Sequence, residues 1–113
     1  MTDRPIAPQF RVGVQQRGSV ATVSLEGELD IATAPRFEQA LAGLEPSYET
    51  LVIDLSHCAF FASSGIAILL GQNDRAESEG FKLLIVKAPP PVQRMFDLAA
   101  LDDRLTFTER PPA

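Results

Sequence analysis

The chain has few of the residues that build metal centres or disulfide frameworks. It contains one cysteine, one histidine and no tryptophan among 113 residues. A single cysteine excludes an internal disulfide, and a zinc site needs three or four ligands. We therefore expect neither a disulfide-bonded extracellular fold nor a bound metal or other cofactor.

Basic residues are outnumbered by acidic ones. The sequence has 10 Lys and Arg against 15 Asp and Glu, for a formal net charge of −5. Proteins that bind a phosphate backbone need clustered basic side chains, and those of this chain are scattered. The composition argues against a nucleic-acid partner.

Long apolar runs are also missing. A stretch such as Ile66 to Leu70 is far shorter than the about 20 residues that a helix needs to cross a bilayer. The first eight residues, Met1 to Pro8, lack the apolar centre of a secretory signal. These features predict a cytoplasmic protein with no direct membrane insertion.

The chain does contain a regular succession of strand and helix signals, which suits one domain over residues 10–108 with flexible tails at 1–9 and 109–113. Residues 10–15 and 20–25 alternate with period two around a Gly-containing turn, which predicts a hairpin. A helix is expected to start near Thr33, with Pro35 in its first turn. Its buried stripe has helical spacing: Phe37, Ala40, Leu41 and Leu44.

The second half predicts a βαβ unit. Residues 51–55 form an apolar run typical of a central strand, a helix follows and stops near Gly80, and residues 82–86 return as a parallel strand. A further helix from Pro91 and a short closing strand near residues 105–107 complete the pattern. The predicted fold class is α/β, a small mixed sheet of hairpin plus βαβ unit packed with amphipathic helices.

The candidate site lies where strand 51–55 passes through a tight loop into the helix that opens with Ser63 and Ser64. The first turn of a helix has unpaired N–H groups and the positive end of the macrodipole, so a phosphate on either serine would be stabilised there. The simpler alternative is that one serine caps the helix, which is worth about 1 kcal/mol. Spacing alone leaves both interpretations open.

Other polar residues near this loop have structural interpretations. Asp54 is expected to accept N–H groups of the loop that follows it. His57 and Cys58 are neighbours on an extended segment, where adjacent side chains point in opposite directions, so Cys58 should pack in the core and His57 should lie at the surface. The phosphate-loop motif ending in Lys-Ser or Lys-Thr is absent, which disfavours a small nucleotide-binding hydrolase. We expect no catalytic residues and no intrinsic enzyme activity.

Three segments resemble the STAS domain, and most closely its stand-alone form, the bacterial anti-sigma factor antagonists. The segments are Gly27-Glu28-Leu29-Asp30, the run from Asp54-Leu55-Ser56 to Ser63-Ser64-Gly65, and Lys82 to Val86 with the amphipathic stretch 92–101 that follows. Family members usually have Asp where this chain has Ala62. The resemblance implies a STAS fold over nearly the whole chain.

The resemblance also implies a mechanism, partner switching. An unphosphorylated antagonist binds an anti-sigma factor serine kinase and so releases a sigma factor, and phosphorylation of the serine that aligns with Ser63 abolishes binding. On this hypothesis Ser64 serves as the helix cap, and a phosphatase is a further candidate partner. The expected partner contacts are Asp30, Ala62, Ser63, Ser64 and Gly65.

A different function on the same fold remains open. The chain would then be a non-switching STAS interaction module, such as the partner of a bacterial lipid-transport ATPase or a scaffold of a stress-signalling assembly.

Overall fold

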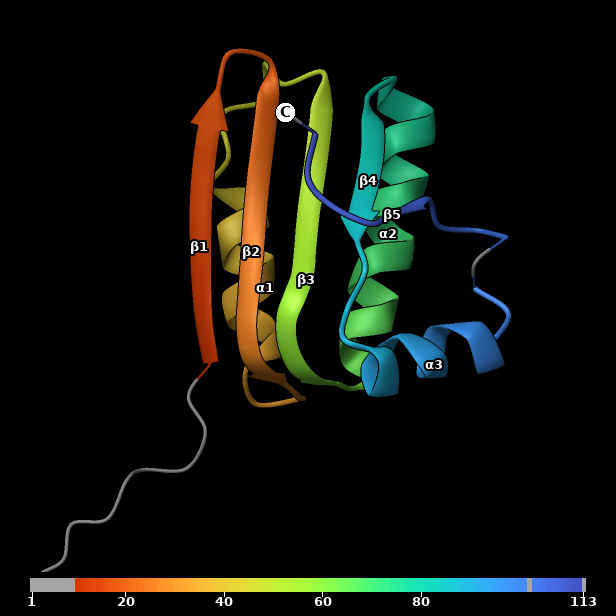
Figure 1. Cartoon of the computed structure of the whole chain (residues 1–113). Helices are drawn as coiled ribbons and strands as arrows, with labels where there is room; N and C mark the ends of the chain where they lie inside the picture. Colours follow the sequence, from red (N-terminus) through yellow and green to blue (C-terminus); the bar gives the residue numbers. More distant parts are fainter. Residues whose placement is uncertain (1–9, 102, 113) are drawn as a thin grey trace, which may run out of the picture.

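The computed structural model describes residues 10–101 and 103–112, which form a mixed five-stranded sheet in the order β1-β2-β3-β4-β5. Helices α1 and α2 cover one face of the sheet (Figure 1). The segment after β5 crosses the other face, and α3 lies at the end of the sheet where β3 leads into α2. This arrangement confirms the predicted α/β class.

The first two strands form the expected antiparallel hairpin. β1 (Phe10–Arg17) pairs with β2 (Val20–Leu29) without a break, from Phe10 opposite Gly27 to Arg17 opposite Val20. Gly18 adopts a φ of 57° in the turn, a conformation that glycine tolerates best. Alternate residues of β2 face the core, as period-two alternation predicts: Ala21, Val23 and Leu25.

The βαβ unit is also present. β3 (Thr50–Phe61) and β4 (Lys82–Val86) are parallel, and α2 (Ser63–Glu79) connects them. α2 ends at Gly80, whose φ of 84° and N–H bond to the carbonyl of Ala76 form a left-handed cap. β3 lies between β2 and β4, which confirms it as a central strand.

One prediction about β3 is wrong. Residues 56–61 form no tight loop; they continue the strand as far as Phe61. β2 continues beside them, with register shifts between Ser24 and Glu26 and between Gly27 and Glu28. These irregularities break the alternation of buried and exposed residues in this part of β3. The sequence therefore lacks the period-two pattern of a strand, although the backbone is paired as one.

Two shorter helices and a short strand complete the fold. In α1 (Ala34–Ala42), Phe37 and Leu41 are buried as predicted. α3 (Pro90–Leu98) begins one residue earlier than expected, and its Phe96 packs between Phe61 and Phe107, with ring centroids 5.5 and 5.3 Å away. β5 (Phe107–Thr108) pairs in parallel with β4.

Of the two segments predicted as flexible tails, the structure describes only residues 109–112 of the C-terminal one. Residues 1–9 and 113 lie outside the described part of the chain. Glu109 forms an ion pair with Lys87 at 3.0 Å, which joins the start of the C-terminal segment to the end of β4. Within the described residues, no helix is long and apolar enough to cross a membrane.

Candidate functional site

The site is the junction at which β3 ends and α2 begins. Ala62 is the N-cap residue, with an extended backbone (φ −84°, ψ 171°), and Ser63 is the first residue of the helix. The N–H groups of Gly65 and Ile66 donate to the carbonyl of Ala62 at 2.9 and 3.3 Å. The earlier N–H groups, those of Ser63 and Ser64, precede any intrahelical acceptor. A negative charge on the exposed Ser63 side chain would therefore lie at the positive end of α2.

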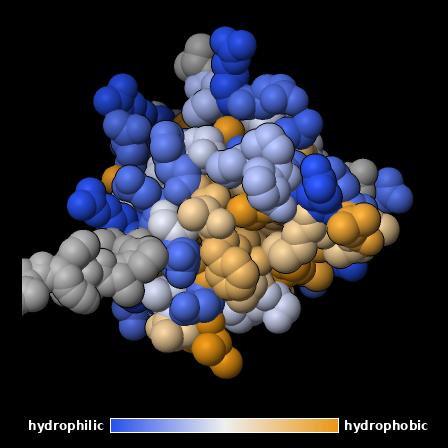
Figure 2. Space-filling view, turned by 60° about the horizontal axis from the view of Figure 1, so that its bottom comes forward, coloured by the Kyte–Doolittle hydropathy of each residue, from blue (hydrophilic) through white to orange (hydrophobic). Residues whose placement is uncertain are grey.

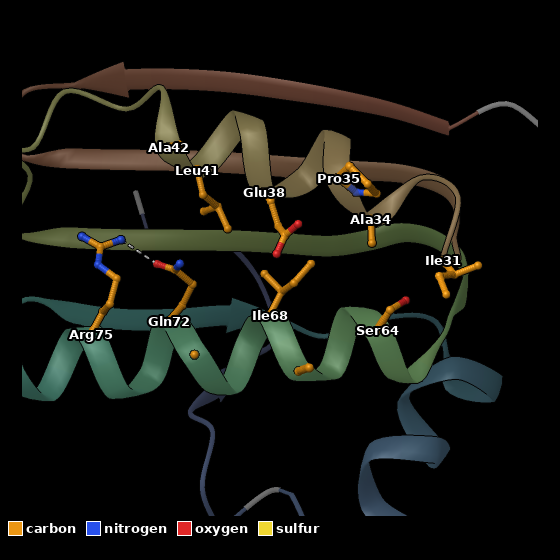
Figure 3. A pocket seen from close by; sticks show the side chains of 12 residues that line it. Ile31, Ala34, Pro35, Glu38, Leu41, Ala42, Ser64, Ile68, Gln72 and Arg75 are labelled. Atoms are coloured by element: carbon orange, nitrogen blue, oxygen red, sulfur yellow. Dashed lines mark hydrogen bonds between the residues drawn. The ribbon is translucent and has the colours of Figure 1, made fainter.

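Ser64 differs from Ser63 in its surroundings. Its side chain points toward α1 rather than along the helix axis (Figure 3). Its hydroxyl oxygen is buried and has no hydrogen-bond partner among the described residues. The prediction that Ser64 caps α2 is wrong, because Ala62 holds the cap position and the second residue of the helix faces a neighbouring helix.

Gly65 sets how closely α2 approaches the sheet. A Cβ atom on Gly65 would overlap the Leu29 side chain and would lie 2.6 Å from Cζ of Phe61. The helix therefore starts directly against the ends of β2 and β3, and only glycine fits this contact. Gly65 is buried, and its close contact with the strand ends fixes the position of the neighbouring Ser63.

Asp30 belongs to the adjacent loop between β2 and α1. Its Oδ1 accepts the N–H groups of Ala32 and Thr33, both at 3.0 Å, and the Thr33 hydroxyl at 3.1 Å. The Thr33 hydroxyl is held within this loop and makes no capping bond to α1. The N–H of Ala62 donates to the carbonyl of Leu29 at 2.9 Å. Asp30 therefore directly follows the residue of β2 that bonds to Ala62, and one of its carboxylate oxygens is already bound within its own loop.

The other polar residues singled out in the sequence have structural roles. Asp54 accepts the N–H of Ser56 at 2.9 Å, but Ser56 belongs to β3 and not to the expected loop. Cys58 is fully buried and donates its S–H to the carbonyl of Phe60 at 3.2 Å, and burial raises the pKa of its thiol. His57 is exposed and contacts the Ser56 hydroxyl. Within residues 10–101 and 103–112, no three His, Cys, Asp or Glu side chains gather as a metal site.

Exposed apolar side chains surround the junction, and sequence reasoning missed them. Ile31, in the β2–α1 loop, is 83% exposed, and Phe60, three residues before Ser63, is 49% exposed. Figure 2 shows an apolar area on this end of the molecule, bordered by hydrophilic side chains. A single apolar residue beside a turn has no hydrophobic periodicity, so the sequence does not show that its side chain is exposed. Such patches often mark interaction surfaces.

A groove of about 790 Å³ between α1 and α2 continues this surface. Figure 3 shows Ile31, Ala34 and Ser64 near one end of it and Gln72 and Arg75 near the other. Arg75 donates to the Glu79 carboxylate at 2.9 and 3.1 Å and to the Tyr48 hydroxyl at 3.2 Å, so its charge is largely satisfied within the protein.

The structure is a mixed sheet with two helices on one face and a serine at the start of the helix after its central strand. Comparisons with known proteins give the family of this fold. The model of the family described as "Mlab, STAS domain" matches residues 12–108. The chain therefore belongs to the STAS domain family, which confirms the resemblance.

Relatives within this family have regulatory names. The anti-sigma-F factor antagonist RsfB of Mycobacterium tuberculosis is 33% identical over 92 residues, which cover 80% of this chain and 75% of that protein. The crystal structure of an anti-sigma factor antagonist from Mycobacterium paratuberculosis is 32% identical, with a TM-score of 0.73, and covers 90% of this chain and 87% of its own. Unphosphorylated SpoIIAA, also an anti-sigma factor antagonist, shares the fold with a TM-score of 0.74 at 16% identity, over 88% of this chain and 90% of its own.

Proposed function

We propose that this protein is an anti-sigma factor antagonist that acts in the cytoplasm by partner switching. The unphosphorylated form binds an anti-sigma factor serine kinase through the end of the molecule around Ser63, and the kinase then releases its sigma factor. Phosphorylation of Ser63 abolishes binding. The observation that carries this proposal is an exposed serine at the N-terminus of α2, surrounded by exposed apolar side chains, in a chain whose relatives are named antagonists.

The structure favours Ser63 over Ser64 as the phosphorylated residue. A kinase must bring its catalytic groups to the hydroxyl, and Ser63 is exposed while the Ser64 oxygen is buried. A phosphate on Ser63 would be stabilised by the first N–H groups of α2. The modified protein would therefore keep its fold while its surface changes charge.

The chemistry of the surrounding surface explains how one phosphate can end binding. A phosphoserine adds about −1.5 to −2 charges near neutral pH. Ile31 and Phe60 would be covered by a bound partner, and placing the phosphate beside them in a closed interface would strip its water. A loss of about 2.8 kcal/mol lowers affinity a hundredfold, which suffices to exchange partners.

The proposal can be tested by capture from a lysate of the native host. Wild type should retain a serine kinase of the anti-sigma type, and Ser63→Asp should lose it. Ser78→Asp is the matched control, because Ser78 is exposed near the other end of the same helix. Retention by Ser63→Asp at the wild-type level would contradict the switch.

The second candidate is a STAS interaction module without a phosphoswitch. It is favoured by Ala62, which leaves no carboxylate directly before Ser63, and by the matched family description. In this case the same end of the molecule would form a permanent interface, for example with a lipid-transport ATPase or a stress-signalling assembly. Equal capture of one such partner by wild type and Ser63→Asp would support it.

A further inference from the structure

The edge of the sheet formed by β1 suggests a second interaction surface. β1 is the first strand of the sheet order and, among the described residues, pairs only with β2. It contains eight residues in unbroken register, with no bulge and no proline, and its two charged side chains, Arg11 and Arg17, lie toward its ends. Natural proteins usually protect such an edge with bulges, prolines or charges, because its free N–H and C=O groups can pair with another strand.

Contacts with neighbouring segments anchor both ends of β1. The Gln16 side chain donates to the carbonyl of Glu45 at 3.2 Å and accepts the N–H of Glu45 at 2.9 Å. At the other end, Phe10 is buried and the Arg36 guanidinium lies 5.2 Å from the centre of its ring. Between these anchors, Val14 is 52% exposed. A strand that added here would find the edge already extended and would cover an apolar side chain.

We propose that β1 pairs with β1 of a second copy of this chain, in antiparallel orientation about a two-fold axis at Gly13. In this register Val12 lies opposite Val14 of the second copy, and Val14 opposite Val12. Arg11 lies opposite Gln15. Apolar β-branched pairs of this kind stabilise neighbouring strands, and the contact is closed and self-complementary.

The sequence of β1 disfavours the neighbouring register. An axis at Val14 would place Arg11 opposite Arg17 twice in each dimer, and like charges directly opposite each other destabilise a strand pair. The axis at Gly13 avoids this and still pairs both valines. Charge therefore favours the axis at Gly13 over the axis at Val14.

This interface is independent of the proposed Ser63 surface. β2 and β3 lie between β1 and β4 in the sheet, and Ser63 lies at the start of α2 (Figure 1). Pairing along a single edge buries less surface than a stable complex of standard size. We therefore expect a weak dimer that forms with increasing concentration.

Sedimentation velocity of the full chain from about 1 μM to about 1 mM tests the proposal, since this range covers weak association. Wild type should pass from monomer to dimer, and Val14→Lys should weaken the dimer at least tenfold. Leu98→Lys is the matched control, because Leu98 is 81% exposed on α3, and it should dimerise as wild type. A wild type that stays monomeric throughout, or a Val14→Lys variant that dimerises equally well, would overturn the proposal.

Cysteine trapping tests the register. Gly13→Cys should form a disulfide-linked dimer under mild oxidation, because residue 13 lies opposite itself, and a Cβ at Gly13 makes only ordinary contact, 3.8 Å from Cβ of Ser24. Val14→Cys should crosslink much less. The buried Cys58 gives no background in the folded protein. Efficient crosslinking of Val14→Cys with none of Gly13→Cys would overturn the axis at Gly13.

Discussion

The backbone N–H of Ala62 donates to the carbonyl of Leu29 at 2.9 Å, which joins the end of β3 to the end of β2 directly before Ser63. This bond fixes where α2 begins relative to the β2–α1 loop. It therefore brings the β2–α1 loop, with the exposed Ile31, to the same end of the molecule as the exposed Ser63. A change that moves the start of α2 should affect binding even without altering an exposed residue.

Gly65→Ala should lower the free energy of unfolding without changing an exposed side chain. The added methyl group meets Leu29 and Phe61, and overpacking of this kind costs about 1–3 kcal/mol. Gly71→Ala is the matched control on the same helix, because a Cβ there meets nothing within 4 Å, and it should stabilise the protein by about 0.5–1 kcal/mol. Urea unfolding of both variants measures the difference. Equal stability of the two variants would show that α2 does not press against the strand ends.

Ala62→Asp should stabilise the protein. Ala62 occupies the N-cap with extended backbone angles, and replacing Ala by Asp at such a position is worth about 0.5–2 kcal/mol. Ala62→Asn supplies a similar cap without the charge, so both variants should show a raised midpoint of thermal unfolding. If the family's usual carboxylate takes part in recognition, only Ala62→Asp should change the rate of phosphorylation. A destabilised Ala62→Asn variant would contradict the capping geometry.

Cys58 should make stability depend on pH under alkaline conditions. Burial raises the pKa of the folded thiol, so above the unfolded pKa of about 8.5 the unfolded chain loses the proton while the folded protein keeps it. The free energy of unfolding should therefore fall as pH rises from about 8.5 toward the folded pKa. Cys58→Ala should remove this part of the slope, as urea titrations at several pH values would show. An unchanged slope in the variant would mean that the thiol does not titrate differently in the two states.

The order of the elements was predictable because each has its own hydrophobic period and a turn residue at its boundary. The stripe through Phe37 and Leu41 and the stop at Gly80 are examples. The extension of β3 through residues 56–61 was not predictable, because it depends on pairing with β2 across two register shifts. The prediction that Ser64 caps α2 was wrong for a similar reason. Contact of Gly65 with Leu29 and Phe61 sets where α2 starts, and that contact involves a strand far away in the sequence.

The central claim is that one phosphate on Ser63 controls binding, and the captured kinase allows it to be measured directly. Purified protein should be incubated with this kinase and ATP, the modified residue mapped by mass spectrometry, and the affinity of both forms measured by calorimetry. We predict phosphate on Ser63 and none on Ser64, and a loss of affinity of about a hundredfold or more, which corresponds to about 2.8 kcal/mol. Phosphate on Ser64, or equal affinity of the two forms, would contradict the account.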